Sequence, residues 1–101
     1  MSTSSEIFAQ IAFLSTKNGG RSVPFGQGFS PKLVFDSSPC EYFTIFNLSD
    51  SDTLFPGDQI KLQLQIKGNP GIHLHKGASF ILLEGQRTIG SGTIMDILSE
   101  Q

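Results

Sequence analysis

His73 and His75 are the strongest candidates for metal ligands in this chain. In an extended segment, the sequence His-Leu-His places both imidazoles on one face. A zinc site needs three or four protein ligands, and no Cys, Asp or Glu lies close enough in the sequence to complete the set. We therefore interpret the pair as part of a solvated loop and expect no metal ion and no cofactor.

Cys40 is the single cysteine of the chain, and it lies between Pro39 and Glu41. A nucleophilic cysteine reacts as the thiolate, which a nearby base or a helix N-terminus favours. The adjacent carboxylate of Glu41 opposes a negative charge on the sulphur, so we interpret Cys40 as an incidental or structural thiol. One cysteine forms no internal disulfide, and no signal peptide or long apolar run is present, so we expect a reducing, cytoplasmic location and no membrane partner.

The remaining candidates for catalysis are weak. Asp50 and Asp52 lie in a Ser/Asp-rich segment that is typical of a solvated turn. The glycine-rich run at 90–92 is expected inside a strand with no helix after it, whereas a phosphate loop ends in Gly-Lys-Ser/Thr and opens a helix. We therefore predict that the chain is not an enzyme and binds no GTP.

Basic residues are few, with seven Lys and Arg against nine Asp and Glu, for a net charge of −2. This balance argues against strong autonomous binding to nucleic acid, which needs clustered basic side chains. Arg21, Lys32, Lys67 and Arg87 would form one basic patch if the fold brings their loops together. The alternative is that they are scattered, solvated charges with one or two ion pairs.

Phenylalanine dominates the aromatic residues, with nine Phe, one Tyr and no Trp. Exposed aromatic side chains can stack on single-stranded nucleic acid, but such platforms have basic neighbours. A small core and its ends also need large apolar side chains, and we favour core and interface packing. The nine positions are Phe8, Phe13, Phe25, Phe29, Phe35, Phe43, Phe46, Phe55 and Phe80.

These residues must be positioned by strands rather than helices, because no long stretch has a helical period. Ile60, Leu62, Leu64 and Ile66 alternate with polar residues, which is the pattern of a strand with one buried face. Glycine and proline separate the short apolar runs, with Gly57 and Gly85 at turns, and Gly90 and Gly92 at bulges or tight corners. The expected strands are 6–15, 31–35, 42–46, 59–67, 78–84 and 87–98.

Six strands in 101 residues predict an all-β domain, either a sandwich or a closed antiparallel β-barrel. We favour the six-stranded closed barrel because closure removes exposed strand edges. The expected organisation is a disordered tail at 1–5, one β-barrel domain at 6–98 and a short tail at 99–101.

Several motifs carry a family resemblance. The turn Phe55-Pro56-Gly57-Asp58 leads into the strand at 59–67, and the chain later reads Glu-Gly-Gln-Arg-Thr-Ile-Gly-Ser-Gly-Thr-Ile from Glu84. In order and spacing these motifs resemble the third, C-terminal barrel domain of elongation factor Tu, over about residues 6–98. Upstream, Gly19-Gly20-Arg21, Pro24-Phe25 and Gly28-Phe29-Ser30-Pro31 are similar to motifs of the same domain.

The resemblance implies a Greek-key barrel that stands alone without the separate GTPase domain of that family. The family's third domain binds the T-arm of tRNA and packs against other protein domains. Glu84, Gly85 and Arg87 match the loop that meets the T-arm, and Lys67 keeps a basic residue at the end of the amphipathic strand. Lys32 follows the shared Pro, whereas Leu83, Gln86 and Asp36 depart from the family's pattern, Leu83 and Asp36 replacing arginines.

Two hypotheses for function follow from this resemblance. In the first, the barrel is a non-enzymatic module that binds a partner protein or associates with itself through a surface that is covered in the full factor. In the second, it is a translation-linked accessory that binds tRNA or other structured RNA. The positions expected to contact either the RNA or the partner are Lys32, Lys67, Glu84, Gly85 and Arg87.

Overall fold

The computed structural model describes residues 4–15, 30–36, 40–46, 54–68, 70–71 and 74–99. Alternating apolar and polar residues form six strands over these segments, as expected. None of the described residues forms a helix long and apolar enough to cross a bilayer. The strands are β1 (Ser4–Phe13), β2 (Lys32–Phe35), β3 (Glu41–Phe46), β4 (Gln59–Lys67), β5 (Ser79–Glu84) and β6 (Arg87–Ser99).

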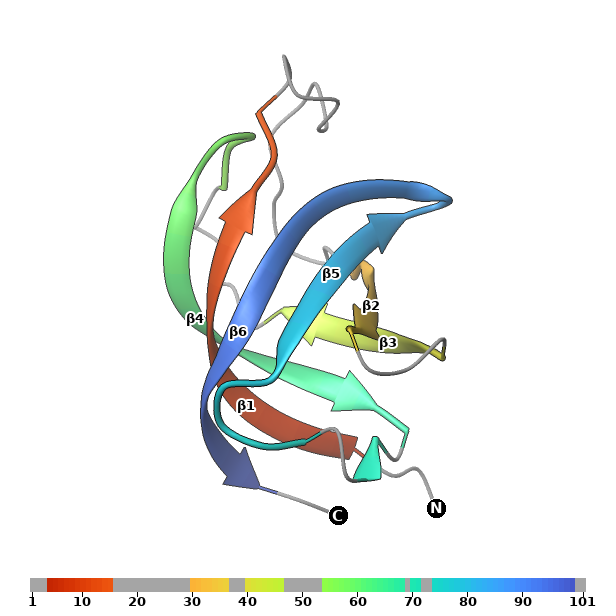
Figure 1. Cartoon of the computed structure of the whole chain (residues 1–101), viewed down its shortest axis with the longest axis vertical. Coiled ribbons are helices and arrows are strands. Elements are labelled where there is room, and N and C mark those ends of the chain that lie inside the picture. The colour runs from red at the N-terminus through yellow and green to blue at the C-terminus, as the bar shows by residue number, and fades with distance from the viewer. Residues whose placement is uncertain are drawn as a thin grey trace.

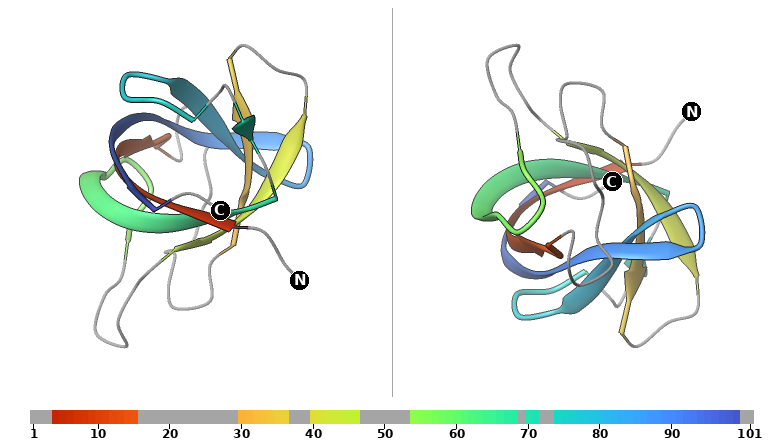
Figure 2. Two further views of the ribbon diagram at one scale, coloured as in Figure 1. Left: turned by 90° about the horizontal axis from the view of Figure 1, so that it is seen from below. Right: turned by 90° about the horizontal axis from the view of Figure 1, so that it is seen from above.

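The six strands form a closed barrel in the order β1-β4-β3-β2-β5-β6, and β1 pairs with β6 to complete the ring. All six pairings are antiparallel. Strands β2, β3 and β4 are consecutive neighbours, and β1 lies beside β4, which is a Greek-key arrangement. Figure 1 shows the long, curved β4 and β6 on either side of β1, and Figure 2 shows the strands curving around a common centre. The prediction of a closed antiparallel barrel is confirmed.

The core fills the barrel with side chains from alternate positions of every strand. Leu62, Leu64 and Ile66 of β4 are buried, and Ile60 is partly buried, so the face predicted from the alternation is the inner face. Each buried aliphatic side chain of this kind contributes about 1.5–3 kcal/mol to the hydrophobic effect. The fully buried large side chains are Ile7, Ile11, Leu33, Phe35, Leu64, Ile66, Phe80, Leu82, Ile89 and Ile94.

The barrel strands extend further at both ends of the chain than the sequence indicated. β1 begins at Ser4 rather than at Glu6, and Ser5 is almost completely buried. β6 continues to Ser99, which pairs with Glu6. Ser4 and Ser5 are small and polar, which favours a tail, but their backbones pair with Lys67 and Ile66 of β4.

The pairing of β6 with its two neighbours is irregular at three places. Its pairing with β5 shifts register between Leu82 and Leu83, and its pairing with β1 shifts at two further places. Such bulges increase local twist and curvature. Gly92 lies against Phe80, and a Cβ atom at Gly92 would lie 2.5 Å from Cζ of that ring. The predicted corner at Gly92 is therefore a place where the strand backbone packs directly on the core.

One polar side chain, Thr44 of β3, is fully buried in the barrel. Its hydroxyl donates a hydrogen bond to the carbonyl of Pro31, with an Oγ1–O distance of 2.7 Å. The hydroxyl of Ser30 donates in return to the carbonyl of Thr44. The first bond satisfies the buried hydroxyl of Thr44 and the second satisfies its backbone carbonyl. Together they fix the residues just before β2 against the middle of β3.

Candidate binding face

Lys32 and Lys67, two of the predicted contact residues, lie on the outer wall of the barrel. Lys32 begins β2 and pairs with Phe43 of β3 on one side and Leu83 of β5 on the other. Lys67 ends β4, immediately after the buried Ile66. Because side chains alternate along a strand, the burial of Leu33 and Ile66 directs both lysines outward.

Phe43 lies between these two lysines on the outer wall. Thr44 pairs with Ile66, and Phe43 and Lys67 each lie one residue beyond that pair in the same direction. On the other side, the Lys32 ammonium lies 5.8 Å from the centroid of the Phe43 ring, within the range of a cation–π contact. We call Lys32, Phe43, Ile45 and Lys67 the Phe43 face.

The Phe43 face exposes unusually large apolar side chains for a strand. Phe43 is 62% exposed and Ile45 is 45% exposed. Both belong to β3, which is paired with a strand on each side. Lys32 also forms an ion pair with Glu41 at 3.3 Å, with both side chains well exposed. Exposed pairs of this kind contribute at most about 1 kcal/mol, so Lys32 is available to exchange partners. Lys67 forms no ion pair within the described part of the chain.

Glu84, Gly85 and Arg87, the other predicted contact residues, form the hairpin between β5 and β6. Gly85 has a φ of 66°, and Gln86, like the other non-glycine residues that the structure describes, does not have a positive φ. The two-residue loop therefore has the glycine-first pattern of a type II′ turn. Glu84 pairs with Arg87 across the hairpin, and their side chains approach to 3.8 Å at the surface. The hairpin directly follows Leu83, the β5 partner of Lys32.

The five predicted residues therefore lie in one band that crosses β4, β3, β2, β5 and β6. The hairpin and the end of β4 both lie on the right-hand side of Figure 1. Lys32 and Lys67 flank Phe43, while Arg87 lies at the hairpin and is balanced by Glu84. Arg21, the fourth member of the predicted basic patch, lies outside the described residues. The structure thus combines the two interpretations, with two neighbouring lysines and two exposed ion pairs.

Among the residues considered for metal binding and catalysis, those that the structure describes do not converge. Within the described ranges no three His, Cys, Asp or Glu side chains come together. His75 is exposed and its Nδ1 lies 3.1 Å from the carbonyl of Lys76; His73, Asp50 and Asp52 lie outside the described residues. Cys40 is exposed just before β3. The glycine-rich run at 90–92 lies within β6, as expected, and not before a helix.

The phenylalanine residues divide between the core and the surface. The prediction of core packing is confirmed at Phe13, Phe35, Phe46 and Phe80, which are buried. Phe35 packs edge-on against both Phe80 and Tyr42, with centroid distances of 6.2 and 5.9 Å. Phe8 is half-buried, Phe43 and Phe55 are exposed, and Phe25 and Phe29 lie outside the described residues.

Sequence reasoning missed the outward orientation of Phe43 and Ile45. The run at 42–46 is aromatic and β-branched throughout, so apolar content alone does not show which face is inside. Glu41 could have indicated the orientation, because a charged residue at the start of a strand faces solvent. Side chains alternate along a strand, so Phe43 and Ile45 lie on the same face as Glu41. The buried alternation at Thr44 and Phe46 agrees with this phase.

The fold defines a class of protein: a small antiparallel Greek-key barrel with an interior filled by side chains. Its candidate binding face, the Phe43 face, lies on the outer wall. The chain matches the family model of the elongation factor Tu C-terminal domain over residues 1–98. The chain therefore belongs to the elongation factor Tu C-terminal domain family, a family of non-catalytic β-barrel domains found in translation factors.

Proposed function

We propose that this barrel is a non-enzymatic binding module that docks a partner protein, or a second copy of itself, through the Phe43 face. The observation that supports the proposal is the pair of adjacent, outward-facing apolar side chains, Phe43 and Ile45. Exposed aromatic residues with a polar border are typical of the centre of a protein interface. The proposal includes a cytoplasmic location and assigns no catalysis, GTP or cofactor to the chain.

Charge at the border of the Phe43 face supports a protein partner. Lys32, Glu41 and Lys67 surround the apolar pair with both signs of charge, as the polar rim of an interface does. The hairpin adds Glu84 and Arg87, which also form a balanced pair. Such a face matches a mixed-charge protein surface better than a uniformly anionic one.

Phe43→Ser is the variant that tests this proposal, because Phe43 is exposed and its loss leaves the core intact. Loss of an interface anchor costs 1.4 kcal/mol or more, which is about a tenfold or greater weakening. We expect the variant to lose self-association measured by light scattering, or to lose photo-crosslinks to a partner from a probe placed at Glu41 in the native cell.

Phe55→Ser is the matched control, since Phe55 is 51% exposed but lies at the turn before β4, away from the Phe43 face. This variant is expected to associate and crosslink like the unmodified protein. Equal behaviour of the two variants would contradict a role for the Phe43 face.

A second candidate function is binding of tRNA or other structured RNA. It is favoured by the position of Phe43 between Lys32 and Lys67, since an exposed aromatic ring with basic neighbours is the arrangement that stacks on bases. Glu84, Gly85 and Arg87 would then extend the contact along the hairpin.

Lys67→Ala tests the RNA hypothesis in a low-salt titration with tRNA. Loss of one phosphate contact is expected to weaken binding and to reduce the slope of log K against log salt by about 1. Lys61→Ala is the control, because Lys61 lies on the outer face of β4 but pairs with Gln10 rather than lying beside Phe43. Absence of salt-dependent binding by the unmodified protein would exclude this function.

A further inference from the structure

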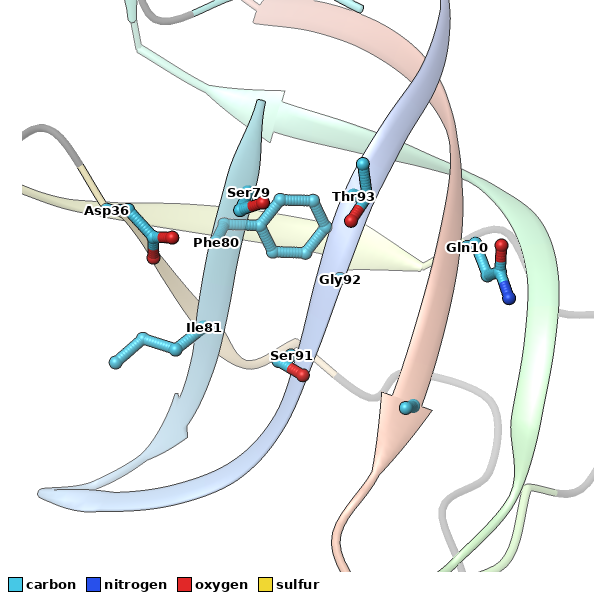
Figure 3. A pocket seen from close by; sticks show the side chains of 9 residues that line it. Gln10, Asp36, Ser79, Phe80, Ile81, Ser91, Gly92 and Thr93 are labelled. Carbon is cyan, nitrogen blue, oxygen red and sulfur yellow. The ribbon is translucent and has the colours of Figure 1, made fainter. Parts of the chain in front are cut away.

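A polar depression of about 470 Å³ lies on the outer wall of the barrel, over β1, β6 and β5 (Figure 3). Thr93 of β6 pairs with Gln10 of β1 on one side and with Ser79 of β5 on the other. The backbone N–H of Asp36 donates to the carbonyl of Ser79 at 3.1 Å. Four polar residues from four neighbouring segments therefore form one row across the depression.

Small residues explain why the wall is hollow at this place. Ala12 and Ser91 pair in the next row. Neither has a side chain large enough to fill the outer surface at this place. The resulting volume falls within the range of pockets that hold small ligands or single side chains, which is roughly 300–1,000 Å³.

The lining of the depression is rich in hydrogen-bond acceptors. Asp36 contributes an exposed carboxylate, and Ser79, Ser91 and Thr93 contribute hydroxyl groups. None of these side chains has a hydrogen-bond or ion-pair partner in the described part of the chain. Asp36 is the only charged residue among the described residues that line the depression, and the hydroxyl groups beside it can accept hydrogen bonds. The lining therefore favours a cationic donor.

An apolar side chain lies next to the carboxylate. Ile81 pairs with Val34 and Ser91 and is only half-buried. In Figure 3, the side chains of Asp36 and Ile81 extend from the same side of the depression. An apolar side chain is therefore available beside the carboxylate.

We propose that this depression receives the side chain of an arginine residue from a partner polypeptide. The aliphatic stem of arginine packs along Ile81, as long basic side chains do on apolar surfaces. The guanidinium group then donates to the carboxylate of Asp36 and to the hydroxyl of Ser79. Arginine is favoured over lysine because its planar group offers five donors to several acceptors at once.

This site is distinct from the Phe43 face, which lies over β2, β3 and β4. A test of one proposal therefore does not decide the other. The probe that tests the arginine site is N-acetyl-L-arginine methylamide, titrated into the ¹⁵N-labelled protein. We expect amide shift changes confined to Asp36, Ser79, Ile81, Ser91 and Thr93. The corresponding lysine derivative is expected to bind more weakly, and the neutral citrulline derivative is expected to produce no saturable shifts.

Asp36→Asn removes the charge and keeps the shape, and it is expected to weaken binding of the arginine probe by about fivefold. Glu41→Gln removes an equal charge from the Phe43 face and is expected to leave the affinity unchanged. The ¹⁵N spectrum of each variant reports directly whether the barrel is folded. Shifts spread over the whole surface, equal binding of the citrulline derivative, or an Asp36→Asn affinity equal to that of the unmodified protein would each overturn the proposal.

Discussion

At the scale of single residues, Thr44 shows how a barrel accommodates one polar side chain in its core. The Thr44 hydroxyl is fully buried and its one hydrogen bond reaches the carbonyl of Pro31. Thr44→Val keeps the shape and leaves that carbonyl without its donor, which costs about 1–3 kcal/mol. We expect a lower free energy of unfolding by that amount, measured by urea denaturation followed by circular dichroism.

Thr93→Val is the comparison for Thr44→Val, because Thr93 is only half-buried and its hydroxyl has no partner in the described part of the chain. A surface change of this type alters the free energy of unfolding by no more than about 0.5 kcal/mol. Equal losses in the two variants would show that the bond from Thr44 to Pro31 contributes nothing to stability.

At the scale of elements, the packing of β6 against the core depends on Gly92, which has no side chain. A Cβ atom at Gly92 would lie 2.5 Å from Phe80 Cζ and 2.8 Å from the backbone carbonyl oxygen of Gln10. Gly92→Ala therefore forces Phe80 and β1 to shift, and overpacking of this kind costs about 1–3 kcal/mol. We expect a corresponding loss in the free energy of unfolding.

The double variant Phe80→Leu/Gly92→Ala tests whether the loss of stability in Gly92→Ala comes from contact with the Phe80 ring. Because Leu relieves the contact with the ring, the double variant is expected to lose less stability than the sum of the two single variants. Additive losses would place the cost of Gly92→Ala elsewhere. Ser91→Ala, one residue away on the outer face, is expected to be nearly neutral.

The positions of the strands were predictable because their physics is local. Alternation at Ile60, Leu62, Leu64 and Ile66 fixes both the strand and its inner face, and β4 has the predicted bounds. The first residues of β1 were less predictable. Ser4 and Ser5 join the sheet through backbone pairing with β4, which their side chains do not reveal.

The candidate face was only partly predictable for a similar reason. The family resemblance indicated Lys32, Lys67, Glu84, Gly85 and Arg87, but their arrangement depends on which strands are neighbours. Lys32 and Lys67 are far apart in the sequence and come together only because β2, β3 and β4 are adjacent. The exposure of Phe43 and the polar depression around Thr93 likewise depend on register and curvature, which arise from pairing across the whole sheet.

At the scale of the whole molecule, the barrel is closed by its last strand. β6 lies between β1 and β5 and pairs with both, so the earlier five strands leave an open sheet with two unpaired edges. The second edge of β1 stays unpaired until residues 87–99 have been made. The barrel therefore closes only when β6 is available, and before that the edges of β1 and β5 can pair with other strands.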